Sequence, residues 1–254
     1  MVTPTIDLMH RHASVRRFKA DPVPAELIET IVAAAQRAST SSNLQLVSVV
    51  AVTEAAKRAR LAEICGQEHV AQAPAVLVWC ADLSRLDRAC ELRGYRQVTE
   101  YVENFLVCTL DIGIAAQNGA LAAESLGLGM CYLGSIRNHV PGVIDLLKLP
   151  RLVFPVVGMV LGWPAVPGTV RPRLPIAAVL HRETYDPAPK DAALHEYDRT
   201  MIATGIYEGR QVGVPGKSGE VEEYGWLEHS ARRVSQAART DLRLALKRQG
   251  FPLE

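Results

Sequence analysis

Near the start of the chain, three side chains that can bind an anion alternate with other residues. His12, Ser14 and Arg16 are spaced two apart, and alternate residues of an extended segment share one face. An imidazole, a hydroxyl and a guanidinium on one face suit a phosphate group or the anionic edge of a ring. A solvated basic stretch after a surface helix explains the same residues, so the pattern alone leaves both interpretations open.

Two further segments offer anion-binding groups. Residues 39–42 are Ser-Thr-Ser-Ser, and short hydroxyls after a helix can bind a phosphate or the polar edge of a cofactor. In Arg171-Pro-Arg173 the proline stiffens an extended chain and can hold both guanidiniums on one side, as a phosphate fork requires. The alternatives are a turn whose hydroxyls bond to their own backbone and two solvated arginines on a loop.

A glycine after a short strand and a basic tail are the remaining candidates. In Tyr132-Leu133-Gly134-Ser135 the glycine would let a backbone N–H approach a planar ligand, although an ordinary turn has the same composition. The tail could clamp a phosphorylated ligand through a mobile basic loop, or simply carry surface charge. Its basic residues are Arg210, Lys217, Arg232 and Arg233.

Motifs for several other chemistries are missing from the sequence. No GxGxxG follows the first expected strand, and there is neither a P-loop nor a GxSxG elbow. The five cysteines form no CxxC pair, which argues against a zinc site or a disulfide framework. The histidines are scattered, and His10 and His12 have no carboxylate at metal-ligand spacing. We therefore expect neither a metal site nor a protein nucleophile.

Length and composition limit the fold and the partners. With 254 residues, 48% of them apolar and 22% charged, the chain can bury a full-sized core. A net charge of +1 provides no basic field for nucleic acid. No uninterrupted apolar run reaches the roughly 18 residues that span a bilayer, and the N-terminus lacks the order of a signal peptide. We expect a reduced, cytoplasmic protein that binds neither nucleic acid nor membrane.

Helices and strands are mixed without a regular βαβ alternation, which favours an α+β fold over a doubly wound sheet. Buried strands are expected where β-branched and apolar residues follow one another, over 46–53, 75–81, 130–133 and 153–161. Helical spacing predicts helices over 3–11, 24–39, 55–64, 98–126, 141–148, 191–204 and 227–249. The helix 98–126 is apolar almost throughout and should lie at the centre, and residues 164–191 should form an extended crossing segment.

An ordered set of motifs runs through the whole chain. In order they are HASVRRF, STSSNLQ, GQEHVAQAP, DIGIAAQNGALAAESLGLGMCYLG, IRN, LLKLP, LGWP and RPRLP. This set resembles the oxygen-insensitive, NADPH-dependent nitroreductase and flavin reductase family, in the subgroup with a C-terminal extension. The resemblance is close over residues 3–204 and loose in the tail.

The resemblance implies an α+β sandwich with a mostly antiparallel sheet and a long central helix. It also implies an intertwined homodimer with two FMN sites at the interface. Residues 1–190 would form the FMN-binding core. Residues 191–254 would be a helical extension with a mobile nucleotide or substrate loop, within the same compact unit.

The resemblance also assigns roles to individual residues. His12, Ser14, Arg171 and Arg173 would bind the FMN phosphate, Arg16 the N1–O2 edge of the flavin, and Gln67 the pyrimidine edge. Tyr132, Leu133 and Gly134 would line the flavin, and Ser39, Thr40 and Ser41 would reach the FMN of the partner subunit. Arg210 would bind NADPH. This chain departs from many relatives at Ala13, where they have Arg, at Arg171, where they have Lys, and in a longer loop over 210–226.

The implied activity needs no catalytic residue from the protein, because the flavin carries the redox chemistry. Two electrons would pass from NADPH to nitroaromatics, quinones or free flavin by a ping-pong mechanism. One alternative is a specialised reductase of the same superfamily, dehalogenating or disulfide-reducing. Another is a flavin-binding sensor or storage protein without turnover. A binding module without flavin would require the ordered motifs to be coincidental.

Overall fold

The computed structural model describes residues 2–214 and 216–254. They form two compact units, Met1–Val170 with Arg239–Glu254, and Arg171–Ala238. The division therefore falls about 20 residues before the predicted boundary at residue 190, and the C-terminal segment belongs to the first unit. Each unit is described separately below.

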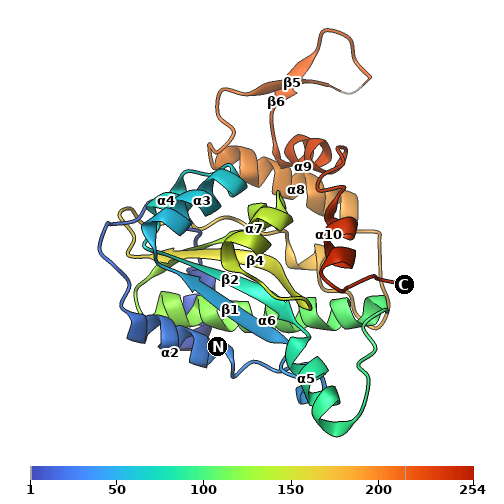
Figure 1. Cartoon of the computed structure of the whole chain (residues 1–254). Helices are drawn as coiled ribbons and strands as arrows, with labels where there is room; N and C mark the ends of the chain where they lie inside the picture. The colour runs from blue at the N-terminus through green and yellow to red at the C-terminus, as the bar shows by residue number, and fades with distance from the viewer. Residues whose placement is uncertain (1, 215) are drawn as a thin grey trace. The chain divides into compact units, whose positions relative to one another are not determined.

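The first unit contains a four-stranded antiparallel sheet (Figure 1). Its strands are β1 (Val47–Val52), β2 (Ala75–Asp82), β3 (Gly129–Leu133) and β4 (Val153–Gly162), in the order β1-β2-β4-β3. All eight residues of β2 are buried, as a run of Val, Leu and Trp in a central strand requires. The predicted α+β class, antiparallel sheet and long central helix are confirmed.

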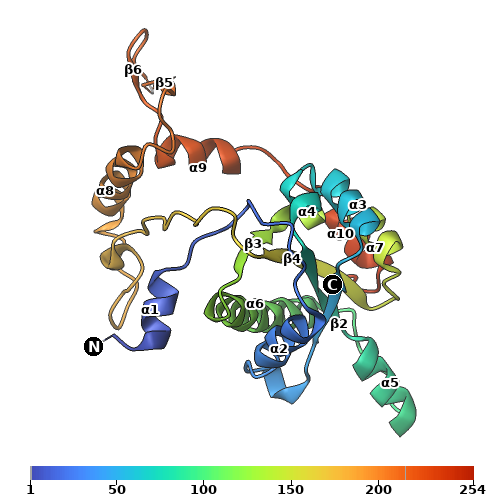
Figure 2. The same ribbon diagram turned by 90° about the vertical axis from the view of Figure 1, so that its left-hand side faces the viewer.

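Helices cover both faces of this sheet. Figure 2 shows α2 (Ala25–Ala35) and α6 (Val102–Ser125) on one face, and α3 (Ala55–Cys65), α4 (His69–Gln72) and α7 (Val140–Leu147) on the other. Two buried hydrophobic clusters correspond to these two faces. The remaining helices of this unit are α1 (Pro4–His10), α5 (Ser84–Arg93) and α10 (Leu242–Arg248).

The central helix α6 packs against the sheet through small residues. A Cβ on Gly119 would lie 3.1 Å from the ring of Trp79 on β2, so the glycine permits this close approach. Apolar side chains spaced four apart on its other face are exposed, at Val102, Leu106, Leu110 and Ile114. The helix is long and apolar enough to span a membrane. The sequence lacks an uninterrupted run of that length because acidic residues interrupt the helix.

An aromatic cluster joins α6, β4 and the segment after α10. Phe105, Phe154 and Phe251 pack edge to face, with ring centroids 5.7–6.2 Å apart. Beside them, the Gln249 side chain donates to the carbonyls of Leu149, Pro150 and Val153. These contacts hold residues 239–254 in the first unit.

Two features of the tail and surface differ from the sequence-based expectation. The single helix predicted over 227–249 is wrong, because α9 (Trp226–Val234) and α10 are separate and Arg239 between them has a φ of +56°. Helix α5, which begins directly after β2, was not expected.

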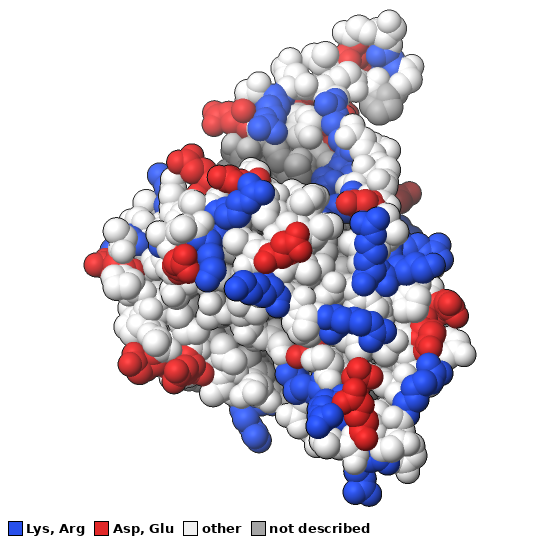
Figure 3. Space-filling view, viewed as in Figure 1, with Lys and Arg blue, Asp and Glu red and all other residues white. Residues whose placement is uncertain are grey.

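Positive and negative side chains are interspersed over the face drawn in Figure 3, in keeping with the small net charge.

The second unit contains α8 (Lys190–Ala203), a hairpin of β5 (Gln211–Gly213) and β6 (Val221–Glu223), and α9. Tyr197 on α8 packs edge to face on Trp226, with ring centroids 5.1 Å apart. The Asp198 carboxylate accepts from the backbone N–H of Leu227 at 2.8 Å. A Cβ on Gly225 would overlap the Asp198 carboxylate, so this junction favours glycine.

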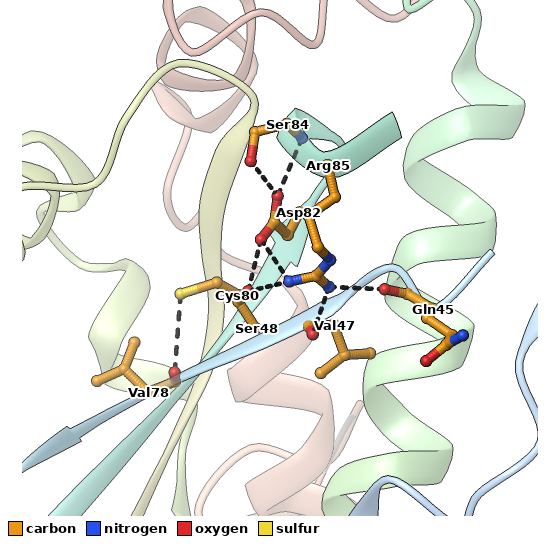
Figure 4. A network of polar contacts seen from close by, with 8 residues as sticks. All are labelled: Gln45, Val47, Ser48, Val78, Cys80, Asp82, Ser84 and Arg85. Atoms are coloured by element: carbon orange, nitrogen blue, oxygen red, sulfur yellow. Dashed lines mark hydrogen bonds and ion pairs between the residues drawn. The ribbon is translucent and has the colours of Figure 1, made fainter. Parts of the chain in front are cut away.

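A buried carboxylate at the end of β2 ties three segments together (Figure 4). Asp82 is 5% exposed and accepts hydrogen bonds from Ser48 Oγ, from the backbone and hydroxyl of Ser84, and from Arg85. Arg85 also donates to the carbonyls of Gln45 and Val47. Because every oxygen of this carboxylate is bonded, the strand end, α5 and the loop before β1 are fixed together.

A second buried carboxylate holds the loop after α2. Asp111 on α6 is 4% exposed. It accepts from Thr40 Oγ1 at 2.5 Å and from the backbone N–H of Ser41 at 3.0 Å. The Thr40 hydroxyl in turn accepts from the backbone N–H of Gln45 at 2.9 Å. This arrangement sustains left-handed backbone at Ser42 and Gln45, which non-glycine residues rarely adopt.

Replacing Asp82 with Ala should destabilise the protein by about 2–4 kcal/mol, because it leaves the Arg85 guanidinium and two serine hydroxyls without their shared acceptor. Because Arg85 is half-exposed, the loss of unfolding free energy should be smaller than for a fully buried ion pair. Urea denaturation measures the difference. The control Asp7→Ala removes only a surface pair with Arg11 and should change stability by less than about 0.5 kcal/mol. Equal losses in the two variants would contradict the role of Asp82.

Replacing Thr40 with Val should cost about 1–3 kcal/mol, since it removes one of the two donors to the buried Asp111 carboxylate. Thr30→Val is a matched control, because its hydroxyl bonds only to the Glu26 carbonyl one helical turn away at 2.7 Å. Thermal and urea denaturation of the two variants should differ clearly. A control as destabilised as Thr40→Val would show that the loss comes from the hydroxyl-to-methyl change itself.

Candidate functional site

The N-terminal segment that carries the alternating donors runs beside β3. The Val15 N–H donates to the Met130 carbonyl at 2.9 Å, and Phe18 forms a bridge with Pro164. A Cβ on Gly129 would lie only 2.7 Å from Val15, so the glycine allows this approach. Val15 is buried between two exposed residues, Ser14 and Arg16. The segment therefore turns its polar residues outward and its apolar residue inward.

His12 is paired with a carboxylate from the last turn of α6. Its Nδ1 lies 2.6 Å from Glu124 Oε1, and the side chains are 25% and 11% exposed. The two residues are 112 positions apart in the sequence. The sequence patterns gave no signal for this partner, because Glu124 lies within an apolar helical stretch.

Gln67 is oriented by a neighbouring hydroxyl. Ser135 Oγ donates to Gln67 Oε1 at 2.8 Å, so the amide NH2 of Gln67 is the part left for a ligand. Burial raises the pKa of the Cys65 thiol in the same region. Arg16 lies near enough to His69 that its charge, after the larger effect of burial, lowers the pKa of that histidine. Of the residues predicted at this edge of the ring, Gln67 is therefore held by a specific neighbour, whereas Arg16 is exposed.

The end of β3 leads directly into a 3₁₀ helix, Gly134–Arg137. Tyr132 is half-buried, its hydroxyl bonds to Gln117 at 3.4 Å, and burial followed by the charge of Glu124 raises its pKa. Leu133 is 2% exposed and lies in the hydrophobic cluster on the α3 side of the sheet. Of the predicted flavin-lining residues, Leu133 therefore offers its backbone rather than its side chain.

Two arginines beside Gly134 were not singled out from the sequence. A Cβ on Gly134 would lie 3.5 Å from Arg137 Nη2 and 3.9 Å from Arg239 Nη2. Burial and the neighbouring Arg239 charge lower the pKa of Arg137. The motif IRN contains Arg137, but Arg239 lies in the polar tail, where nothing in the local pattern marks it. Together they place two positive charges next to the predicted flavin-lining backbone.

The hydroxyl run is held within its own subunit by Asp111, as described above. Ser39 and Thr40 also line a cavity of about 410 Å³ together with Ser48, Trp79 and Arg85. The expected contact of Ser39, Thr40 and Ser41 with the FMN of a partner requires a second chain, and it stays a prediction.

The second unit contains the other predicted arginines. Arg173 Nη1 donates to the carbonyls of Arg171 and Pro172, so this guanidinium folds back on its own backbone. Arg210 lies 5.8 Å from the centroid of the Tyr224 ring, which Arg232 approaches to 5.6 Å. Tyr207, Arg210 and Tyr224 line a cavity of about 480 Å³. This unit therefore presents a cluster of aromatic rings and guanidiniums.

Side chains suited to nucleophilic catalysis are shielded in this structure. Four of the cysteines are buried, and burial raises the pKa of Cys80 and Cys108 to about 12. The reactive thiolate is therefore scarce at neutral pH. Within residues 2–214 and 216–254, no three His, Cys, Asp or Glu side chains gather where they could hold a metal ion. The arrangement is one of donors and positive charges for binding anionic and planar groups.

Comparison with known proteins shows which family this chain is similar to. The family model described as "Nitroreductase family" matches residues 9–163, and the one described as "Nitroreductase family, C-terminal domain" matches residues 171–254. The oxygen-insensitive NADPH nitroreductase of Salmonella typhimurium is 36% identical, covering 98% of this chain and 99% of that protein. The FMN reductase (NADPH) of Bacillus subtilis is also 36% identical, covering 97% of this chain and 98% of that protein.

A solved structure shows the same fold over nearly the whole length. The NADPH:FMN oxidoreductase from Vibrio harveyi, complexed with NAD+, superposes with a TM-score of 0.86 at 33% identity, covering 99% of this chain and all of that one. The two family segments occur here in the same chain and in sequence. The predicted resemblance is confirmed, and the chain belongs to the nitroreductase family, with its C-terminal domain.

Proposed function

We propose that this protein is an FMN-dependent oxidoreductase that transfers two electrons from NADPH to a small-molecule acceptor. The observation that carries the proposal is the packing of the His12–Arg16 segment along β3, close to the strand end that carries Tyr132 and Gly134. This packing brings the N-terminal segment, with groups suited to a phosphate, beside the strand end, with groups suited to a planar ring. Relatives across the full length are named NADPH nitroreductase and FMN reductase.

The donor groups of the first unit fit FMN. The cofactor is anionic at its phosphate and has carbonyl oxygens at its pyrimidine edge, so it requires hydrogen-bond donors at both ends. His12 and Ser14 would bind the phosphate, and the Gln67 amide, freed by Ser135, would donate to the ring carbonyls. When bound, FMN supplies the redox chemistry, accepting hydride from the nicotinamide and passing two electrons to the acceptor.

The charges of the chain would tune this chemistry. Arg16 is exposed and would favour negative charge at the N1–O2 edge of the ring. Arg137 and Arg239 would favour acceptors that carry or develop negative charge, such as nitro groups and quinones. Arg171 and Arg173 remain predicted phosphate ligands. A cytoplasmic location fits the five free cysteines.

The decisive experiment is an anaerobic titration of the purified protein with NADPH. We expect a yellow protein with bound FMN whose flavin absorbance disappears, and returns when a nitroaromatic, a quinone or free flavin is added. Parallel lines in double-reciprocal plots would support the ping-pong order. A colourless protein that takes up no FMN would rule out the proposal. A flavoprotein that NADPH does not reduce would favour the sensor or storage alternative.

The exposed apolar side of α6 supports the proposed homodimer. Leu106, Leu110 and Ile114 are 46–57% exposed, and such a stripe on a central helix offers a self-complementary surface. Leu110→Glu places a charge on it and should convert a dimer of twice the 27.7 kDa chain mass into monomers, as measured by light scattering. Val234→Glu, at an exposed residue of α9, should leave the mass unchanged. A wild-type protein that is monomeric with FMN bound would contradict the proposed assembly.

Arg210 is proposed to select NADPH over NADH. Its guanidinium can form a charge-assisted pair with the 2′-phosphate, which NADH lacks. Arg210→Ala should therefore raise the Michaelis constant for NADPH by about ten- to a hundredfold and leave that for NADH nearly unchanged. The control Lys57→Ala removes a surface charge paired with Glu54 at 2.8 Å and should change neither Michaelis constant. Equal effects on both nucleotides, or none, would shift the assignment to Lys217, Arg232 or Arg233.

A further inference from the structure

The pair between His12 and Glu124 joins the N-terminal segment to the end of α6. Its 2.6 Å separation is that of a strong, charge-assisted hydrogen bond. Both partners are mostly buried, at 25% and 11% side-chain exposure. The contact therefore forms in a partly desolvated place, where a charge interacts more strongly than at an open surface.

Glu124 is an unusual residue for its surroundings. Neighbouring positions of α6 that face inward are Ala120 and Ala123, and both are fully buried. Its second oxygen, Oε2, is buried and has no hydrogen-bond partner among the described residues. A half-satisfied carboxylate in such a place lowers stability, and an apolar residue would pack there at less cost. Packing alone therefore does not account for Glu124.

The role of the Glu124 carboxylate follows from which of the two His12 ring nitrogens donates a hydrogen bond and which accepts one. Because Glu124 only accepts hydrogen bonds, Nδ1 must carry a proton. In a neutral ring, Nε2 would then be an acceptor and would repel phosphate oxygens. Only the doubly protonated ring donates from both nitrogens at once. With Nδ1 engaged by Glu124, Nε2 is the ring nitrogen left for a second partner, and donation from it to an anion requires a proton there as well.

We propose that Glu124 is a positioning residue for the cofactor phosphate, acting through His12. This inference rests on the proposed function, in which His12 binds the phosphate of FMN. Glu124 does not touch the cofactor. It fixes the orientation of the imidazole and makes it a donor to the phosphate. The role resembles that of the carboxylates that orient metal-binding histidines, here with an anion in place of the metal.

Comparison of FMN with riboflavin tests the proposal, since riboflavin has the same ring system and no phosphate. Glu124→Gln keeps the shape of the side chain and an oxygen acceptor but removes the charge. It should raise the dissociation constant of the apoprotein for FMN about tenfold or more, and that for riboflavin by less than about threefold. Fluorescence quenching on titration measures both constants. Glu63→Gln, at an exposed residue on α3 paired with Arg60, is the matched control.

A double-mutant cycle separates positioning from a structural effect. In a His12→Ala background, Glu124→Gln should no longer change FMN affinity, because the residue it acts through is gone. Equal weakening of FMN and riboflavin by Glu124→Gln, unchanged FMN affinity, or additive effects in the cycle would each overturn the proposal. Failure of the wild-type protein to bind FMN would instead overturn the proposed function itself, so the two failures are distinguishable. Thermal melts confirm that each variant is folded.

Discussion

The contact between Trp79 and Gly119 sets the position of the central helix on the sheet. Trp79 lies on a fully buried strand, and Gly119 lets α6 approach within van der Waals distance of its ring. Together with the buried Ile112, Ala116 and Ala120 of the same helix, this contact fixes the depth and rotation of α6. Three polar side chains of α6 depend on that rotation. Asp111 holds the loop after α2, Gln117 bonds to Tyr132, and Glu124 holds His12.

The polar groups of the site are therefore organised from one apolar interface. A small change in helix rotation would move all three of these side chains together, since they share one rigid element. In our proposal the positions of these side chains matter, because the protein part of a cofactor-dependent enzyme contributes orientation and electrostatics rather than reactive groups of its own. Burial raises the pKa of Cys65, Cys80 and Cys108, so these thiols are weak nucleophiles at neutral pH.

Much of the fold could be predicted from the sequence because its signals are local. The runs 46–53, 75–81 and 153–161 are apolar and β-branched, and each corresponds to an observed strand. The break between α9 and α10 could not be found in this way, since Arg239 adopts a positive φ without any glycine or proline to announce it. Its conformation comes from tertiary contacts, including its bond to Asn138 at 3.2 Å.

For the candidate site, too, the sequence shows local patterns but not contacts between distant segments. His12, Ser14 and Arg16 were proposed from their spacing and Gln67 from the family resemblance, and their roles in binding stay predictions. Glu124 and Ser135 belong to segments that the sequence analysis quoted, but their pairing with His12 and Gln67 joins residues 112 and 68 positions apart, which no local pattern reveals. Leu133 was assigned correctly to the strand end, but its side chain belongs to the core, because alternate residues of a strand face opposite sides.

The aromatic cluster of Phe105, Phe154 and Phe251 has a consequence for biosynthesis. Its third ring lies beyond the whole second unit in the chain, so the ribosome must make residues 171–238 before the cluster can close. At roughly 5–20 residues per second, the sheet and α6 wait several seconds with part of their apolar surface uncovered. During that interval α6, which is long and apolar, exposes to solvent the surface that Phe251 later covers.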